Sequence, residues 1–179
     1  MIFFNNIVKE VSQTGEKIDE GEVKELVSCI ESARHIFVTG MGRSGLMIKA
    51  FANRLMHLGY SVSIVGEISS PHSKPGDLLL IGSGSGETAS LINQAEISRK
   101  NDMKIALITA NSESSLAKMA DCIVKIPSNS KYDTSEALQP MGSGFEQVSL
   151  LLYDSIVLYL MEKKGETNES MKLRHADME

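Results

Sequence analysis

The residues best suited to chemistry form a loop of glycines and hydroxyl side chains that follows a short apolar run. The run covers residues 78–81, and the loop then reads G-S-G-S-G-E-T before a helical pattern resumes at Ala89. The first N–H groups of a helix are unpaired and its dipole is positive there, so the loop could hold an anion. The glycines let the backbone approach a ligand, and the hydroxyls add donors. We therefore predict a phosphate-binding loop made of Ser83, Gly84, Ser85, Gly86, Glu87 and Thr88.

This loop also has a plainer interpretation. Gly/Ser loops after strands occur as ordinary turns, and Thr88 can serve only as the cap of the following helix. No lysine follows the glycines, so the loop is not of the Walker type, whose signature ends in Gly-Lys-Ser/Thr.

A second glycine loop, G-M-G-R-S-G, covers residues 40–45 and follows an earlier apolar run. Its glycines match the dinucleotide-binding pattern G-x-G-x-x-G, and Glu67 stands where a ribose-binding acid is expected. A dinucleotide site is therefore one alternative, and a tight turn with closely packed glycines is another. The third interpretation is that Gly42, Arg43 and Ser44 contact a phosphate or sugar hydroxyls.

Five short apolar runs must position these loops. The predicted strands cover residues 35–39, 61–65, 78–81, 104–109 and 121–126, with helical patterns between most of them. This alternation predicts an α/β fold, a three-layer doubly wound sandwich around a five-stranded parallel sheet. Both glycine loops then lie at the carboxyl edge of the sheet, where such sheets bind ligands. The site should hold a small phosphorylated molecule at two points.

The remaining chain is predicted to be helical. Residues 1–33 contain two amphipathic patterns, separated near Gly15, that should pack on the rest of the chain or on a neighbouring subunit. A capping box, Asp19-x-x-Glu22, begins the second of them. Residues 34–179 form the main domain, including a long helix over about 143–164 and a charged tail.

Composition excludes several classes of protein. The 179 residues carry a net charge of −5 and contain no Lys/Arg block, which argues against a nucleic-acid partner. The first residues do not resemble a signal peptide, and no apolar run is long enough for a membrane span. Cys29 and Cys122 are far apart and lack metal-site spacing, so we expect two reduced thiols, no metal site and a cytoplasmic location.

Taken together, these motifs resemble the sugar isomerase (SIS) domain, and more closely the 6-phospho-3-hexuloisomerase family. The resemblance rests on the two glycine loops, I-T-A-N-x-x-S-S-L-A-K-M-A-D after the fourth strand, R-S-G-L-M-I-K-A-F-A-N-R-L-M-H-L-G-Y, V-G-E, Q-P-M-G-S-G-F-E-Q and the tail R-H-A-D-M-E. It covers nearly all of residues 36–179. Met41 stands where the family usually has alanine, and we expect its side chain to face away from the ligand.

The resemblance implies an isomerase of the ribulose monophosphate route of formaldehyde fixation, converting 3-hexulose 6-phosphate to fructose 6-phosphate through an enediol and without a cofactor. It places the catalytic base at Glu146. The alternative is a purely structural role, in which Ser143-x-x-Glu146 is a capping box at a helix start.

The resemblance also implies a homotetramer that works together with 3-hexulose-6-phosphate synthase. His57 is a second catalytic candidate, acting in a neighbouring subunit's site, and His175 is a substrate-binding candidate. The alternative for His57 is a histidine that the helix dipole favours at a helix C-terminus, and the alternative for His175 is a solvated residue of the tail. Two other functions stay open, namely a non-catalytic SIS-type sugar-phosphate sensor and an isomerase of arabinose 5-phosphate or sedoheptulose 7-phosphate.

Overall fold

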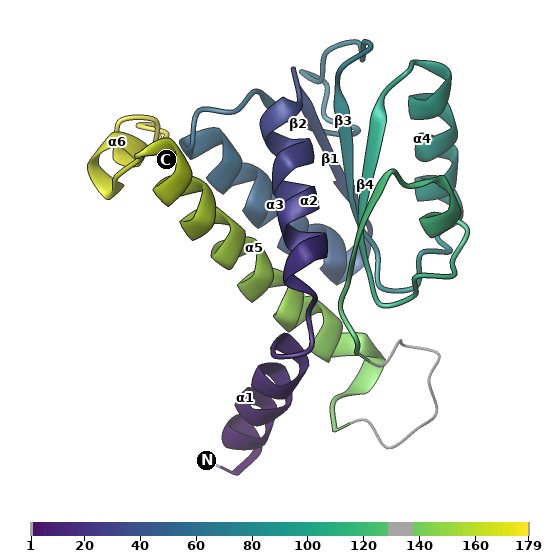
Figure 1. The fold of residues 1–179 in the computed structure, drawn as a ribbon, viewed down its shortest axis with the longest axis vertical. Coiled ribbons are helices and arrows are strands. Elements are labelled where there is room, and N and C mark those ends of the chain that lie inside the picture. The colour runs from purple at the N-terminus through teal and green to yellow at the C-terminus, as the bar shows by residue number, and fades with distance from the viewer. Residues whose placement is uncertain (1, 129–137, 179) are drawn as a thin grey trace.

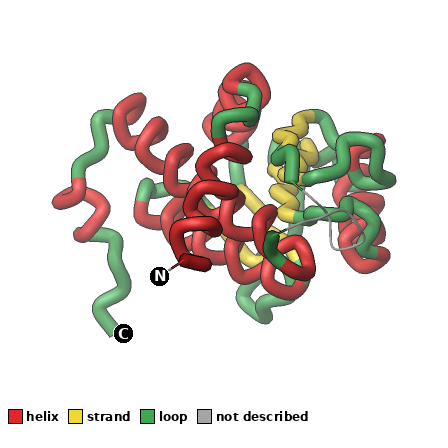
Figure 2. The backbone as a smooth tube through the Cα atoms, turned by 90° about the horizontal axis from the view of Figure 1, so that it is seen from below, coloured by secondary structure: helices red, strands yellow, loops and turns green. Residues whose placement is uncertain are grey.

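The computed structural model, which describes residues 2–128 and 138–178, contains a five-stranded parallel sheet between two layers of helices (Figures 1 and 2). The strands are β1 (Ile36–Gly40), β2 (Val62–Ile64), β3 (Leu78–Gly82), β4 (Lys104–Thr109) and β5 (Cys122–Lys125). Their order is β2-β1-β3-β4-β5, and all four pairs are parallel. The predicted fold class is confirmed, with β2 shorter than the apolar run that predicted it.

Helices cover both faces of the sheet. The longer ones are α1 (Ile2–Gly15), α2 (Glu20–Ser32), α3 (Gly42–His57), α4 (Ala89–Lys100) and α5 (Ser143–Lys164), and the shorter ones are α6 (Asn168–Lys172) and the 3₁₀ turns η1 (Ala117–Met119) and η2 (Pro140–Gly142). Because side chains alternate along a strand, Leu78 and Leu80 pack toward α2, α3 and α5, while Leu79 and Ile81 pack toward α4 and η1. This explains why β3 is apolar at consecutive positions: it is buried on both faces.

The strand order creates a crevice between β1 and β3. Gly40 at the end of β1 pairs in register with Gly82 at the end of β3. The chain leaves β1 toward α3 on one face and leaves β3 toward α4 on the other (Figure 1). Such a divergence opens a binding crevice at the carboxyl ends of the two strands. Both glycine loops therefore lie at this edge of the sheet.

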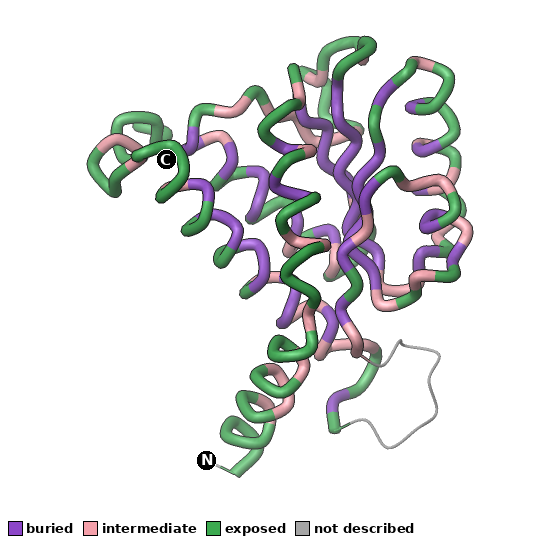
Figure 3. Tube along the Cα trace, in the orientation of Figure 1, coloured by how far each residue is buried: buried purple, intermediate pink, exposed green. Residues whose placement is uncertain are grey.

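The first helix projects from the body of the molecule (Figure 1). It lies against the start of α5, where the side-chain amide of Gln139 donates to the carboxylate of Glu10 at 2.9 Å. The described residues of α1 are all at least partly exposed, whereas α2 buries Leu26, Val27 and Ile30 against the sheet (Figure 3). At the start of α2, the Asp19 carboxylate accepts a hydrogen bond from the Glu22 N–H at 2.9 Å, as expected for a helix cap.

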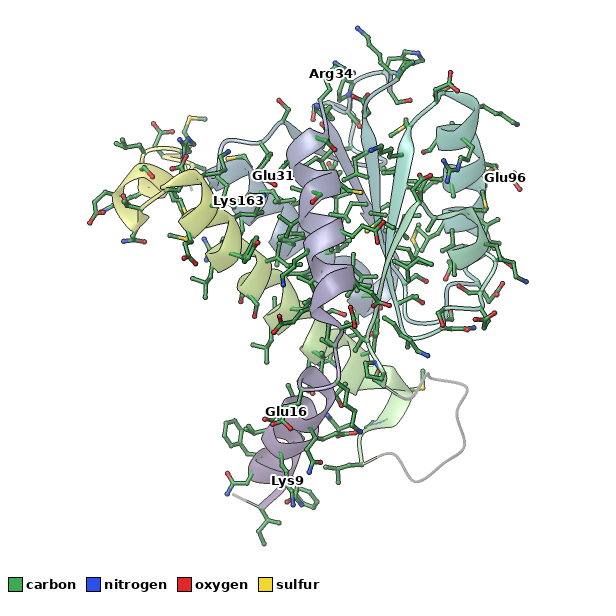
Figure 4. The ribbon with its side chains drawn as sticks, in the orientation of Figure 1. Lys9, Glu16, Glu31, Arg34, Glu96 and Lys163 are labelled. Carbon is green, nitrogen blue, oxygen red and sulfur yellow. The ribbon has the colours of Figure 1, made fainter. Side chains whose placement is uncertain are left out.

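The long helix α5 packs beside α3 and carries the chain to the C-terminal tail. Lys163, near the end of α5, forms an ion pair with Glu31 of α2 (Figure 4). Cys29 and Cys122 are free thiols. None of the helices in the described ranges combines the length and apolar character needed to cross a bilayer.

Candidate active site

A cleft of about 430 Å³ lies at the carboxyl ends of β1 and β3. Its walls come from the two glycine loops and from the segment that leads into α5. It is lined by Met41, Gly42, Arg43, Ser44, Gly82, Ser83, Gly84, Ser85, Thr88, Leu91, Met141, Gly142, Ser143, Phe145 and Glu146. The volume suits a small organic ligand.

Contacts from β4 and the segment after it hold the second glycine loop in shape. The hydroxyl of the buried Thr109 donates to the Gly84 carbonyl at 3.2 Å, and the backbone N–H of Ala110 donates to the same oxygen at 3.1 Å. The Ser83 hydroxyl accepts a hydrogen bond from the Gly86 N–H at 3.2 Å. Gly86 has φ +66°, and a Cβ there would lie 2.0 Å from the hydroxyl oxygen of Ser114. The loop therefore has a fixed shape that requires glycine at position 86.

Four of the six residues predicted in this loop line the cleft, namely Ser83, Gly84, Ser85 and Thr88. Thr88 is the N-cap residue of α4, but its side chain makes no capping hydrogen bond within that helix. Gly86 and Glu87 are not among the lining residues. The Glu87 carboxylate accepts a hydrogen bond from the Ser115 N–H at 2.8 Å, and hydrogen bonds from the side chain and then the backbone of Ser115 lower the pKa of Glu87. Glu87 thus joins the loop to the segment that follows β4.

The first glycine loop combines close packing with polar side chains that face the cleft. A Cβ on Gly45 would lie 2.5 Å from the Gly40 carbonyl oxygen, so this glycine serves packing, as the tight-turn interpretation requires. Gly42, Arg43 and Ser44 all line the cleft. Met41, which was expected to face away from the ligand, is also among the residues that line the cleft.

The start of α5 brings a carboxylate to the same cleft. The side chain of Glu146 is 13% exposed, and one of its oxygens lies 3.3 Å from Nε of Arg43. The same guanidinium donates through Nη1 to the Ser143 hydroxyl at 3.1 Å. Ser143 in turn donates to the Pro140 carbonyl at 2.7 Å. The capping-box interpretation of Ser143-x-x-Glu146 is therefore not realised, because Gly142 is the N-cap residue and has no side chain with which to cap the helix.

Burial and charge act in opposite directions on Glu146. Partial burial raises its pKa above the usual range, while the positive charge of Arg43 and a hydrogen bond from Ser44 oppose the rise. A carboxylate in this balance remains a usable base near neutral pH and is more basic than one in water.

His57 and His175 lie elsewhere in the subunit. His57 is the last residue of α3, whose first residue lines the cleft, and a helix of 16 residues is about 24 Å long. The His57 side chain is buried and stacks on His175, with ring centroids 5.1 Å apart. Arg174 fastens the tail there, donating to the His57 carbonyl and to both carboxylate oxygens of Glu166. The structure thus brings the two histidines together but not to the cleft of their own subunit.

Several lining residues carry no signal that a sequence can show. Leu91 and Phe145 belong to amphipathic helices and are typical core residues by pattern. A Cβ on Gly84 would lie 3.1 Å from the Phe145 ring, so Phe145 forms part of the floor under the loop. The motif Q-P-M-G-S-G-F-E-Q marks the segment as special but does not show that Met141, Gly142 and Ser143 face the same space as Arg43.

The geometry does not favour the alternative of a dinucleotide or metal site. Glu67, the acid that a dinucleotide site would use for the ribose, is exposed and does not line the cleft. Across residues 2–128 and 138–178, no three His, Cys, Asp or Glu side chains gather in a way that could hold a metal ion.

A parallel sheet in this order, with a hydroxyl-rich loop after β3 and an arginine-bearing loop after β1, is a doubly wound α/β domain suited to binding a small anionic ligand at the edge of its sheet. The SIS domain family model matches residues 29–158, and the chain belongs to this family. The match includes both glycine loops and Glu146.

Individual relatives are similar over nearly their whole length. The chain is 46% identical over 176 residues to the 3-hexulose-6-phosphate isomerase of Bacillus subtilis, covering 97% of this chain and 95% of that one. It is 38% identical to the protein of the same name from Mycobacterium gastri, covering 95% and 86%. A crystal structure from Methanococcus jannaschii, for which a molecular function of 3-hexulose-6-phosphate isomerase was inferred, has a TM-score of 0.84 at 30% identity and covers 99% and 97%.

Proposed function

We propose that this chain is a 6-phospho-3-hexuloisomerase, an isomerase that converts D-arabino-hex-3-ulose 6-phosphate to D-fructose 6-phosphate. The observation that carries the proposal is the shared cleft, in which a hydroxyl-rich loop at a helix N-terminus and the carboxylate of Glu146 face one small space. Its relatives from two bacteria bear the name of this activity and match over most of the chain. The reaction belongs to the ribulose monophosphate pathway of formaldehyde fixation.

The loop after β3 is the proposed anchor for the phosphate. Its backbone shape is held by β4, and α4 begins directly after it with the positive end of its dipole toward the cleft. The hydroxyls of Ser83, Ser85 and Thr88 add donors around the anion. Binding energy from the phosphate can then hold the reacting carbons in place, although they are remote from it.

Glu146 is the proposed base. Its carboxylate removes the proton from C2, beside the C3 carbonyl, and the electron pair of the C–H bond forms the enediolate double bond while charge moves to the C3 oxygen. Protonation of that oxygen gives the enediol, and loss of the C2 hydroxyl proton with return of a proton to C3 leaves the carbonyl at C2. Proton and electron counts balance within one molecule, so the isomerisation itself is redox-neutral.

Arg43 and Ser44 are the proposed partners of the developing negative charge. They share the cleft with Glu146, and the guanidinium of Arg43 is close enough to the carboxylate to reach groups bound beside it. A positive group placed before the reaction begins stabilises an enediolate more effectively than water does, because it does not need to reorganise. Arg43 therefore has two tasks, tuning the base and binding oxygen atoms of the substrate.

We extend the proposal to a homotetramer, with His57 and His175 of one subunit contributing to the cleft of a neighbour. An apolar groove of about 1000 Å³ runs between α1, α2 and α5, and apolar side chains such as Phe3, Phe4 and Leu158 are exposed on these helices. Exposed apolar surface of this extent is typical of contacts between subunits. Because His57 lies too far from the cleft of its own subunit to act there, it would act in the cleft of a neighbouring subunit.

The proposed setting is the cytoplasm, where free thiols such as Cys29 and Cys122 persist. The substrate is the product of 3-hexulose-6-phosphate synthase, so functional coupling to that enzyme is part of the proposal. The phosphorylated ketohexose is the expected small-molecule partner.

A coupled assay tests the proposal. The purified chain receives 3-hexulose 6-phosphate with no added metal or nucleotide, and the appearance of fructose 6-phosphate is followed. We expect turnover with this substrate and little or none with arabinose 5-phosphate or sedoheptulose 7-phosphate. Binding of these phosphosugars without any turnover would instead support the alternative function, a non-catalytic sugar-phosphate sensor.

A further inference from the structure

Met141 has an unusual backbone conformation at the rim of the cleft. Its dihedral angles are φ 59° and ψ 24°, in the left-handed region. Among the non-glycine residues of the described ranges, only Met141 and Asp102 have positive φ. Aspartate tolerates this region because its short side chain can bond locally, but an unbranched apolar side chain gains nothing from it. Such an outlier is often retained because it places a side chain where function needs it.

The side chain of Met141 is also in an unusual environment. It is 74% exposed, yet it lines a cleft whose other walls are largely glycine, serine and charged groups. Met41, from the opposite glycine loop, lines the same cleft and is 44% exposed. Two long apolar side chains at a cleft lined by glycine, serine and charged groups remain in contact with water unless a ligand or a neighbouring subunit covers them.

A phosphosugar offers a surface that can cover them. Its carbon skeleton presents C–H groups between the hydroxyls, and the flexible, polarisable thioether of methionine adapts to an irregular surface of this kind. Met141 and Glu146 line the same cleft, so in the proposed complex an apolar side chain at position 141 can cover the carbons on which the base acts. Covering those carbons also removes water from the reacting centre.

We propose that Met141, supported by Met41, is a specificity-determining residue that packs against the carbon skeleton of the substrate, while the loop after β3 holds its phosphate. This inference rests on the proposed function for the identity of the ligand. It assigns the left-handed backbone at Met141 the task of holding an apolar side chain over the cleft.

Calorimetric binding to the 179-residue chain separates the two contacts. Met141→Gly removes the side chain and relieves the backbone, so the Kd of fructose 6-phosphate should rise about tenfold, which corresponds to 1.4 kcal/mol. The Kd of inorganic phosphate should stay unchanged, because this ion contacts only the loop. Met141→Ala should weaken fructose 6-phosphate to the same degree, and Met141→Leu should keep the Kd within roughly twofold, since it preserves the apolar volume.

Asp102→Gly is the matched control. It relieves the only other left-handed non-glycine backbone in the described chain, in the exposed turn between α4 and β4 and outside the cleft, so it should leave both affinities unchanged. Equal affinity of Met141→Gly and the parent chain for fructose 6-phosphate would overturn the proposal. A changed oligomeric mass of Met141→Gly would also overturn it, by showing that this side chain packs on another subunit. Neither readout needs turnover, so a failed isomerase assay would leave this test intact.

Discussion

The Nε atom of Arg43 lies 3.3 Å from a carboxylate oxygen of Glu146, although 102 residues separate the two in the chain. Arg43 belongs to the first turn of α3 and Glu146 to the first turn of α5. Since α3 and α5 pack side by side, their first turns meet at the cleft. This ion pair joins the proposed base to the proposed oxyanion partner before any substrate binds.

Replacing Glu146 with glutamine should abolish turnover while leaving the fold and the affinity for the product nearly unchanged. The amide keeps the size of the side chain but cannot accept the C2 proton, and the phosphate loop is untouched. Loss of the order of 10³-fold or more in kcat is expected when a general base is removed, and it can be measured in the coupled assay.

Glu162→Gln is the control, because Glu162 is an exposed glutamate near the other end of the same helix. It should behave as the parent chain does. Near-normal kcat in Glu146→Gln would remove this residue from the mechanism.

Removing the charge of Arg43 should change the pH dependence in a defined direction. The base must be ionised to act, so the rate falls as the pH drops through the pKa of Glu146. Arg43 opposes the rise in that pKa caused by burial, and its loss lets the pKa rise further. Arg43→Gln should therefore move the acidic limb of the kcat profile to higher pH.

Arg43→Lys should return this limb toward its original position, because it restores the charge without the planar fork. The overall rate of both variants should fall, since Arg43 is also a proposed substrate ligand, but only the position of the limb reports on Glu146. An unmoved limb in Arg43→Gln would mean that the ion pair does not tune the base.

The sequence predicted the fold well because the relevant signals are local. Four consecutive apolar residues at 78–81, a loop of glycines and a resumed helical pattern identify a buried strand and its exit without any knowledge of the neighbours. The observed bounds of α5, Ser143–Lys164, match those expected from its pattern. Local chemistry of this kind is readable from a single sequence.

The orientation of individual side chains in the cleft could not be predicted in the same way. Glu87 lies outside the cleft lining because the Ser115 N–H, 28 positions later, binds its carboxylate. Met41 lines the cleft, although its position in the loop was expected to face away from the ligand. The ion pair between Arg43 and Glu146 depends on the packing of two helices that are far apart in the chain. Such outcomes depend on tertiary contacts rather than on local pattern.

The fixed shape of the proposed phosphate-binding loop predicts a large effect of a small substitution. Gly86→Ala places a methyl group in a left-handed backbone and within 2.0 Å of the Ser114 hydroxyl, so the loop must move. We expect a loss of about 3 kcal/mol in the free energy of unfolding, together with weaker binding of inorganic phosphate. Denaturant unfolding and calorimetry measure the two effects.

Gly76→Ala isolates the backbone contribution. Gly76 also has positive φ, at +86°, but a Cβ there would meet nothing within 4 Å. The substitution Gly76→Ala should lower the free energy of unfolding by only about 1 kcal/mol and leave phosphate binding unchanged. If the two variants lose equal stability and both bind phosphate normally, the contact with Ser114 does not shape the loop.

The two histidines lead to a prediction about how subunits share a site. His57 stacks on His175 at the far end of α3 from the cleft of its own subunit. If a neighbour's cleft uses His57, then His57→Ala and Glu146→Gln should each be inactive alone. Their mixed oligomers, however, should recover activity, because some sites then combine an intact Glu146 from one subunit with an intact His57 from another.

The measurement is a coupled assay after the two variants have been unfolded together and refolded, compared with each variant refolded alone. His72→Ala mixed with Glu146→Gln is the control, since His72 is an exposed loop residue and its variant should be active without any partner. Activity of His57→Ala alone at the parent level would refute a shared site. Mixtures that form mixed oligomers but stay inactive would mean that His57 stabilises the C-terminal tail and does not act in a shared site. Arg174 already holds the tail at the end of α3, by donating to the His57 carbonyl.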